Sequence, residues 1–67
     1  MEPSARNQIR GTVSSIKHGA LMAEVVVDIE SQELTATITI GSLERLVLKV
    51  GDRVTAIIKA SDVLIGK

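Results

Sequence analysis

The chain has 67 residues, with no cysteine, no aromatic residue and one histidine, and its eight basic and eight acidic side chains give a formal net charge of zero. This composition excludes disulfides, disfavours a zinc cluster and, at this length, predicts one domain that spans residues 1–67. Such a domain buries only about 60% of the surface that its unfolded chain exposes. The 45% content of apolar residues therefore favours a subunit that is stabilised by oligomerisation.

The charge balance also bears on partners and location. A sequence-independent nucleic-acid binder needs a surplus of positive charge, which this chain lacks. The chain has no apolar run of about 18 residues. Residues 1–3 lack the basic and apolar regions that open a secretory signal. We therefore expect no nucleic-acid partner, no membrane association and a cytoplasmic location.

Alternating apolar and polar residues predict the first three strands. Residues 8–17 show the period of two that is typical of a half-buried strand. Gly11 lies inside this strand and indicates a sharp bend or a close approach of two backbones, with an ordinary tolerated glycine as the alternative. The same alternation predicts two further strands at residues 21–29 and 33–40, each of which follows a turn.

The rest of the chain predicts one short helix and two more strands. Gly41 and Ser42 break the third strand, and we expect Ser42 to cap a helix over residues 43–46. Strand patterns follow at residues 53–59 and 63–65. The fold class is therefore predicted to be all-β, a five-stranded OB-like barrel with one short helix between strands three and four.

A cluster of hydrogen-bond donors directly precedes the first strand, in the sequence Ser4-Ala5-Arg6-Asn7-Gln8. Ser4 offers a hydroxyl, and Arg6 offers a planar guanidinium that stays charged. The small Ala5 leaves its backbone N–H group open. Such a stretch suits a small oxyanion, because a hydroxyl, main-chain N–H groups and a cation can point at one place. The alternative is a solvated N-terminal arm.

A second cluster of the same kind lies where the fourth strand ends. Its members are a cation, a small residue and a hydroxyl, namely Lys59, Ala60 and Ser61. With Thr39 and Ser42 beside the strand-to-helix break, the two clusters supply two positive charges and several neutral donors. This is the complement that a tetrahedral dianion needs in a partly dry pocket. The alternative is an ordinary strand end followed by an ordinary turn.

Other kinds of function receive less support from the residues. Nucleophilic catalysis needs a nucleophile and a base, and one histidine, His18, without any cysteine makes such a site improbable, so we expect no enzyme. The sequence has no glycine-rich phosphate loop and no metal-ligand spacing. Binding of single-stranded nucleic acid by an OB barrel depends on aromatic side chains and a basic groove, and both are missing.

The motifs that hold these residues resemble those of one family. They are Ser4-Ala5-Arg6-Asn7-Gln8, Ile9-Arg10-Gly11-Thr12-Val13, Leu48-Lys49-Val50-Gly51-Asp52 and Ile57-Ile58-Lys59-Ala60-Ser61-Asp62-Val63. They closely resemble the molbindins, small cytoplasmic "Mop" proteins with a TOBE domain that bind molybdate, and the resemblance runs over essentially the whole chain. The same domain occurs in molybdate-responsive regulators and in molybdate transporter ATPases.

The resemblance implies an OB-like barrel assembled as a hexamer, a trimer of dimers, with oxyanion sites between subunits. By that resemblance the main site would contain Ser4, Ala5, Arg6, Lys59 and Ala60, with Thr39 and Ser42 from the partner chain and Ser61 as a candidate neighbour. The chain departs from the family pattern at Ile40-Gly41, where related domains have a polar residue or alanine. It also departs at Val47, where a glycine is frequent.

The sequence thus predicts a binding protein that sequesters molybdate, and tungstate as well, in molybdenum homeostasis. The anion is its ligand and no cofactor is expected. We expect charge-assisted hydrogen bonds without direct coordination of the metal by protein atoms. The alternatives are a structural or interaction barrel that binds no ligand and, third, a single-stranded nucleic-acid-binding OB domain.

Overall fold

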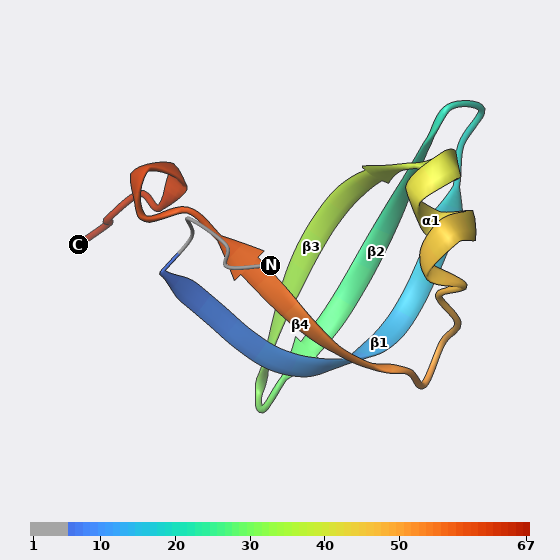
Figure 1. Ribbon diagram of the computed structural model, residues 1–67. Coiled ribbons are helices and arrows are strands. Elements are labelled where there is room, and N and C mark those ends of the chain that lie inside the picture. Colours follow the sequence, from blue (N-terminus) through green and yellow to red (C-terminus); the bar gives the residue numbers. More distant parts are fainter. Residues whose placement is uncertain (1–5) are drawn as a thin grey trace.

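The computed structural model describes residues 6–67, so the predicted site residues Ser4 and Ala5 lie outside the described part of the chain. The element order is β1 (Asn7–His18), β2 (Met22–Ile29), β3 (Gln32–Thr39), α1 (Ile40–Leu46), β4 (Arg53–Ile58) and the short 3-10 helix η1 (Ala60–Asp62), as Figure 1 shows. The expected all-β class and the helix between the third and fourth strands are confirmed.

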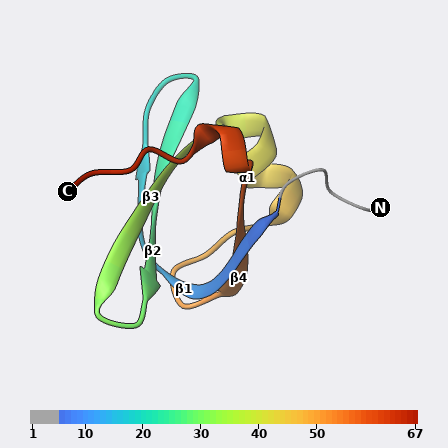
Figure 2. The ribbon, with the colours of Figure 1, turned by 90° about the vertical axis from the view of Figure 1, so that its left-hand side faces the viewer.

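The described strands form one antiparallel sheet in the order β3-β2-β1-β4. β1 serves both halves of this sheet, because its first part pairs with β4 and its second part pairs with β2. The change of partner occurs at Thr12, which lies opposite Arg53 on one side and Asp28 on the other. The sheet curls strongly, so that β4 turns toward β3 across the interior (Figure 2).

Gly11 allows this curl. A Cβ atom at this buried position would lie 2.5 Å from the Asp28 carbonyl oxygen and 2.5 Å from Val27 Cγ1. Cβ atoms do not approach other heavy atoms so closely, and only glycine lets the two backbones meet here. The predicted close approach is therefore confirmed. A β-bulge follows at Ser14 and increases the local twist of the sheet. The Ser14 hydroxyl donates to the Val26 carbonyl oxygen at 3.2 Å.

The core is small and aliphatic. Its buried members are Val13, Ala23, Val25, Val27 and Leu43. Leu43 comes from α1 and covers one end of the curled sheet. Leu46 and Val47, at the other end of the helix, each remain 64% exposed. In one copy of the chain the helix therefore closes only part of that end.

The start of α1 differs from the prediction. Thr39, and not Ser42, is the N-cap: it has extended backbone angles, and its Oγ1 accepts a hydrogen bond from the Ser42 N–H group at 3.0 Å. Threonine caps helices well, so the helix begins at Ile40, within the segment that was expected to be strand. Ser42 consequently lies in the first helical turn, and its own hydroxyl is left for other contacts.

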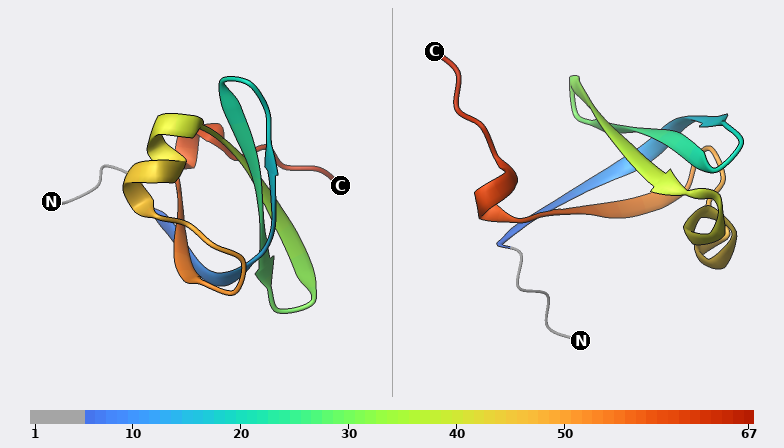
Figure 3. Two further views of the ribbon diagram at one scale, coloured as in Figure 1. Left: turned by 90° about the vertical axis from the view of Figure 1, so that its right-hand side faces the viewer. Right: turned by 90° about the horizontal axis from the view of Figure 1, so that it is seen from above.

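The predicted fifth strand is wrong for the single chain. Lys59 leads into η1, and residues 63–67 have no regular secondary structure. Leu64 and Ile65 are 93% and 91% exposed, and the chain runs away from the sheet there (Figure 3). A strand needs a neighbour for its backbone N–H and C=O groups, and none of the described strands lies beside this segment. The four-stranded sheet is therefore not closed into the five-stranded barrel that was expected.

The only helices of residues 6–67 are short. None of them is both long and apolar enough to cross a membrane.

Candidate functional site

Arg6 and Lys59 lie at the same end of the β1–β4 ladder. The last register pair at that end is Asn7 with Ile58, and the Asn7 side-chain amide donates to the Ile58 carbonyl oxygen at 3.2 Å. Arg6 directly precedes the first residue of this pair, and Lys59 directly follows the second. In an antiparallel ladder these are opposing positions. The two predicted cations therefore come from opposite ends of the sequence to one edge of the fold, and both are exposed.

Ala60 and Ser61 continue from Lys59 into η1. The turn is closed by a hydrogen bond from the Asp62 N–H group to the Lys59 carbonyl oxygen at 2.9 Å. The N–H groups of Ala60 and Ser61 belong to the first turn, where a helix leaves its N–H groups to other acceptors. We name Arg6, Lys59, Ala60 and Ser61 the terminal cluster. It combines two cations, a hydroxyl and main-chain donors.

Thr39 and Ser42 form a second group around the start of α1. The Thr39 hydroxyl donates to Ser42 Oγ at 2.9 Å, and it accepts from the Ser42 N–H group at 3.0 Å. Arg45 joins them, because its Nη2 donates to Ser42 Oγ at 3.3 Å. We name Thr39, Ser42 and Arg45 the helix cluster.

Arg45 was missed in the sequence. The signal that could have found it is its spacing of three residues from Ser42, which places both side chains on one face of a helix. That spacing is informative only once the helix is known to begin before Ser42.

The structure does not bring the two clusters together within one chain. Thr39 lies opposite Met22, close to the end of the ladder where His18 pairs with Ala23, whereas the terminal cluster adjoins Asn7 at the other end of β1. The 12 residues of β1 would span about 36 Å if the strand were straight. Figure 1 and the right-hand view of Figure 3 agree in placing the C-terminal segment and α1 at opposite sides of the molecule. Any site that contains both clusters must therefore include two copies of the chain.

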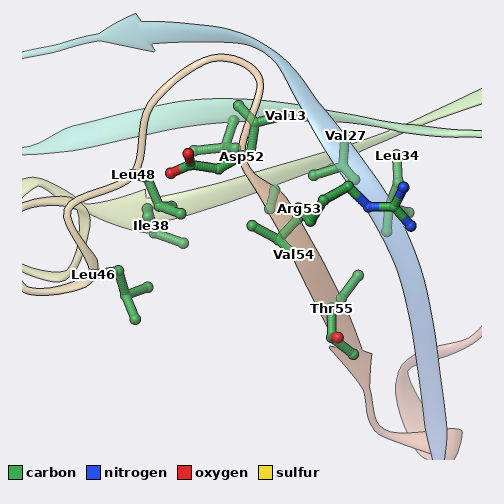
Figure 4. Close-up of a pocket in the computed structure, with 13 residues that line it drawn as sticks. Val13, Val27, Leu34, Ile38, Leu46, Leu48, Asp52, Arg53, Val54 and Thr55 are labelled. Carbon is green, nitrogen blue, oxygen red and sulfur yellow. The ribbon is translucent and has the colours of Figure 1, made fainter.

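The open interior of the curled sheet differs from the two clusters in its chemistry. It is a cavity of about 490 Å³ between β3 and β4 (Figure 4). Its lining is mainly aliphatic, with Leu34, Ala36 and Ile38 from β3 facing Val54 and Ala56 from β4. No member of either cluster lines it. An aliphatic cavity would not offset the charge of an anion, so it is a poor candidate for the ligand site.

The described part of the chain contains no cluster of side chains that could ligate a metal ion. Among residues 6–67, no three histidine or carboxylate side chains gather in a way that could hold a metal ion. The donors of the two clusters are cations, hydroxyls and N–H groups, which suit an anion.

Three comparisons with known proteins place the chain in one family. Residues 3–65 match the TOBE domain family. Molybdenum-pterin-binding protein 1 of Clostridium pasteurianum is 44% identical over 66 residues, which cover 97% of each chain. A molybdate binding protein from Sporomusa ovata has a solved structure with 43% identity and a TM-score of 0.96, with 100% of both chains covered.

A further solved structure is that of the cytoplasmic molybdate-binding protein ModG with molybdate bound. It is 40% identical with a TM-score of 0.89, and the match covers 96% of this chain and 46% of that one. The resemblance inferred from the sequence motifs is thereby confirmed. The chain belongs to the TOBE domain family and is molbindin-like.

Proposed function

We propose that this protein binds molybdate, and tungstate as well, and serves as a cytoplasmic store for the anion without catalysing a reaction. The observation that carries the proposal is the position of Arg6 and Lys59 at one end of the β1–β4 ladder. The relatives support the choice of ligand, since two of the similar structures are described as molybdate-binding proteins and one as cytoplasmic.

The chemistry of the terminal cluster fits a tetrahedral dianion. The Arg6 guanidinium can donate two parallel hydrogen bonds, while the Lys59 ammonium acts as a compact point charge. Together they offset the two negative charges of the anion. Ser61 and the Ala60 N–H group add neutral donors, and Ser4 and Ala5 are expected to add more from the segment that precedes Arg6. The anion is then held by hydrogen bonds, with no bond from the metal to the protein.

The site is completed by a second copy of the chain. The helix cluster is too far along β1 to reach the terminal cluster of its own chain, so Thr39 and Ser42 are assigned to the partner. A two-fold contact makes this exchange reciprocal, because each chain gives its terminal cluster to one site and its helix cluster to the other. This arrangement supports the dimers from which a hexamer, a trimer of dimers, is built.

Exposed apolar surface supports the same assembly. The single chain leaves Leu21, Leu64 and Ile65 at least 80% exposed, and the aliphatic cavity between β3 and β4 is open. Apolar surface of this extent on so small a domain marks an interaction site. The C-terminal segment has a strand-like sequence but pairs with no strand among residues 6–67. A second copy would supply such a strand and complete the barrel.

A bare oxyanion fits better than a molybdenum-pterin compound, although one relative is named for the latter. A pterin ring is planar and aromatic, and protein sites hold such rings by stacking aromatic side chains on them. This chain has no phenylalanine, tyrosine or tryptophan. Its donors are grouped around a small volume at a strand end, which suits a compact anion.

Titration calorimetry with molybdate, tungstate and sulfate tests the proposal. We expect heat and saturation with molybdate and tungstate, and weaker binding of the smaller sulfate ion. Arg6→Ala and Lys59→Ala should each weaken molybdate binding by about tenfold or more, because each removes a charge-assisted hydrogen bond. Arg10→Ala is the matched control, since Arg10 is exposed on β1 and belongs to neither cluster.

Three results would contradict the proposal. They are the absence of heat with molybdate, sulfate binding as tight as molybdate binding, and normal affinity in both the Arg6 and the Lys59 variants. A stable oligomer without any anion response would favour the alternative of a purely structural barrel, for which the exposed apolar surface is the supporting observation.

A further inference from the structure

Arg45 is a charged residue of the helix cluster to which neither the family motifs nor the proposed site assigns a role. It lies in the last turn of α1, and its side chain reaches back to the first turn to donate to Ser42 Oγ at 3.3 Å. The first turn holds no acidic residue that would compete for the guanidinium. The cluster therefore consists of two hydroxyls and one cation.

The hydrogen bonds around Ser42 use the acceptor positions of its hydroxyl and leave its proton available as a donor. A serine hydroxyl has two acceptor positions and one donor proton. Both acceptor positions of Ser42 Oγ are used, one by the Thr39 hydroxyl and the other by Arg45 Nη2. With these two hydrogen bonds in place, the Ser42 proton is available for an acceptor outside the cluster, such as an oxyanion.

Gly41 leaves room for this arrangement. A Cβ atom at this position would lie 3.6 Å from Arg45 Nη1 and 4.0 Å from Thr39 Oγ1, which is ordinary contact distance. A longer side chain would meet the guanidinium. Gly41 therefore leaves the guanidinium room to reach Ser42, and the small side chain of alanine would leave that room as well.

We propose that Arg45 is a positioning residue of the oxyanion site: it fixes the Ser42 hydroxyl as a donor to the bound anion and makes the helix cluster positive. This inference rests on the proposed function, in which Ser42 contacts the anion held by the terminal cluster of a second copy. The guanidinium acts through Ser42, so its effect on binding depends on that hydroxyl. A third cation beside a doubly negative ligand also strengthens the attraction at low ionic strength.

Calorimetry with molybdate on a set of variants tests the inference. The set is the wild type, Arg45→Gln, Arg45→Lys, Ser42→Ala, the double variant Arg45→Gln/Ser42→Ala, and Arg10→Gln as a control that removes an exposed arginine elsewhere. We expect Arg45→Gln to weaken molybdate binding by about tenfold and Arg45→Lys to recover part of the loss. In the Ser42→Ala background, Arg45→Gln should weaken binding by only about two- to threefold. Arg10→Gln should bind like the wild type.

The outcomes separate this inference from the function on which it rests. If the wild type binds molybdate but Arg45→Gln binds as tightly as Arg10→Gln, Arg45 has no role in the site and the inference is wrong. The same conclusion follows if Arg45→Gln has an equal effect with and without the Ser42 hydroxyl. A wild type that binds no molybdate overturns the proposed function itself. Because Arg45 is exposed, we expect its substitution to leave the assembly unchanged. Size-exclusion chromatography of each variant checks this expectation.

Discussion

At the scale of single residues, the backbone of Val47 has a strained conformation. This residue follows α1 with φ 53° and ψ 45°, in the left-handed region, and its N–H group bonds back to the carbonyl oxygen of Glu44 at 3.1 Å. A β-branched residue in this region is strained by about 1–2 kcal/mol, whereas glycine adopts it freely. The sequence comparison with the family flagged this position, and the structure supplies the physical reason for a glycine there.

We therefore predict that Val47→Gly raises the free energy of unfolding by about 1 kcal/mol per chain. The measurement is urea unfolding at a fixed protein concentration, since assembly makes stability concentration-dependent. Val50→Gly is the matched control, because Val50 has nearly the same exposure, 62% against 64%, but not a positive φ. A loss of stability in Val47→Gly equal to that of the control would show that the strain is not real.

Residue-level prediction worked where a residue type has one physical use. Gly11 in an alternating strand indicated a close approach, which is confirmed because a Cβ atom there would lie only 2.5 Å from atoms of Asp28 and Val27. The capping residue was harder to predict, because Thr39 and Ser42 both carry the hydroxyl that a helix start prefers. Arg45 was missed for the same reason, since its spacing from Ser42 matters only when Ser42 is helical.

At the scale of elements, the period of two predicted β1 to β4 to within a few residues at each end. The pattern reports which side chains a strand would bury, and all four of these strands find partners within the chain. The predicted strand at residues 63–65 has an equally apolar sequence and forms no strand. Alternation and β-propensity describe a capacity to pair, and they do not say whether the partner belongs to the same chain.

This reasoning predicts that the C-terminal segment holds the assembly together. Leu64→Asp should shift the protein toward smaller species, because a charge would replace an apolar side chain that the oligomer buries. Analytical ultracentrifugation measures the change. Gly66→Asp places the same charge two residues further along, where an added Cβ atom would meet no atom of a non-neighbouring residue within 4 Å, and should leave the oligomer intact. If both variants sediment like the wild type, the segment takes no part in assembly.

At the scale of the whole molecule, the terminal cluster and the helix cluster occupy opposite ends of β1. The sequence predicted the donors of both clusters except Arg45, together with Ser4 and Ala5, which lie outside the described residues. The family resemblance assigned Thr39 and Ser42 to a partner chain, but the residues alone did not reveal this separation, because distance along the chain says little about distance across a curled sheet. In the proposed site, this separation makes oligomerisation a condition for ligand binding.

Mixing two defective variants tests this account most directly. One variant, Arg6→Ala/Lys59→Ala, lacks the cations of the terminal cluster, and the other, Thr39→Ala/Ser42→Ala, lacks the hydroxyls of the helix cluster. Each alone should bind molybdate poorly. After the two are unfolded together and reassembled, calorimetry should recover about one quarter of the wild-type sites, because half of the two-fold contacts are mixed and each of those has one intact site. A mixture that binds no more molybdate than its separate components would contradict a site shared between copies.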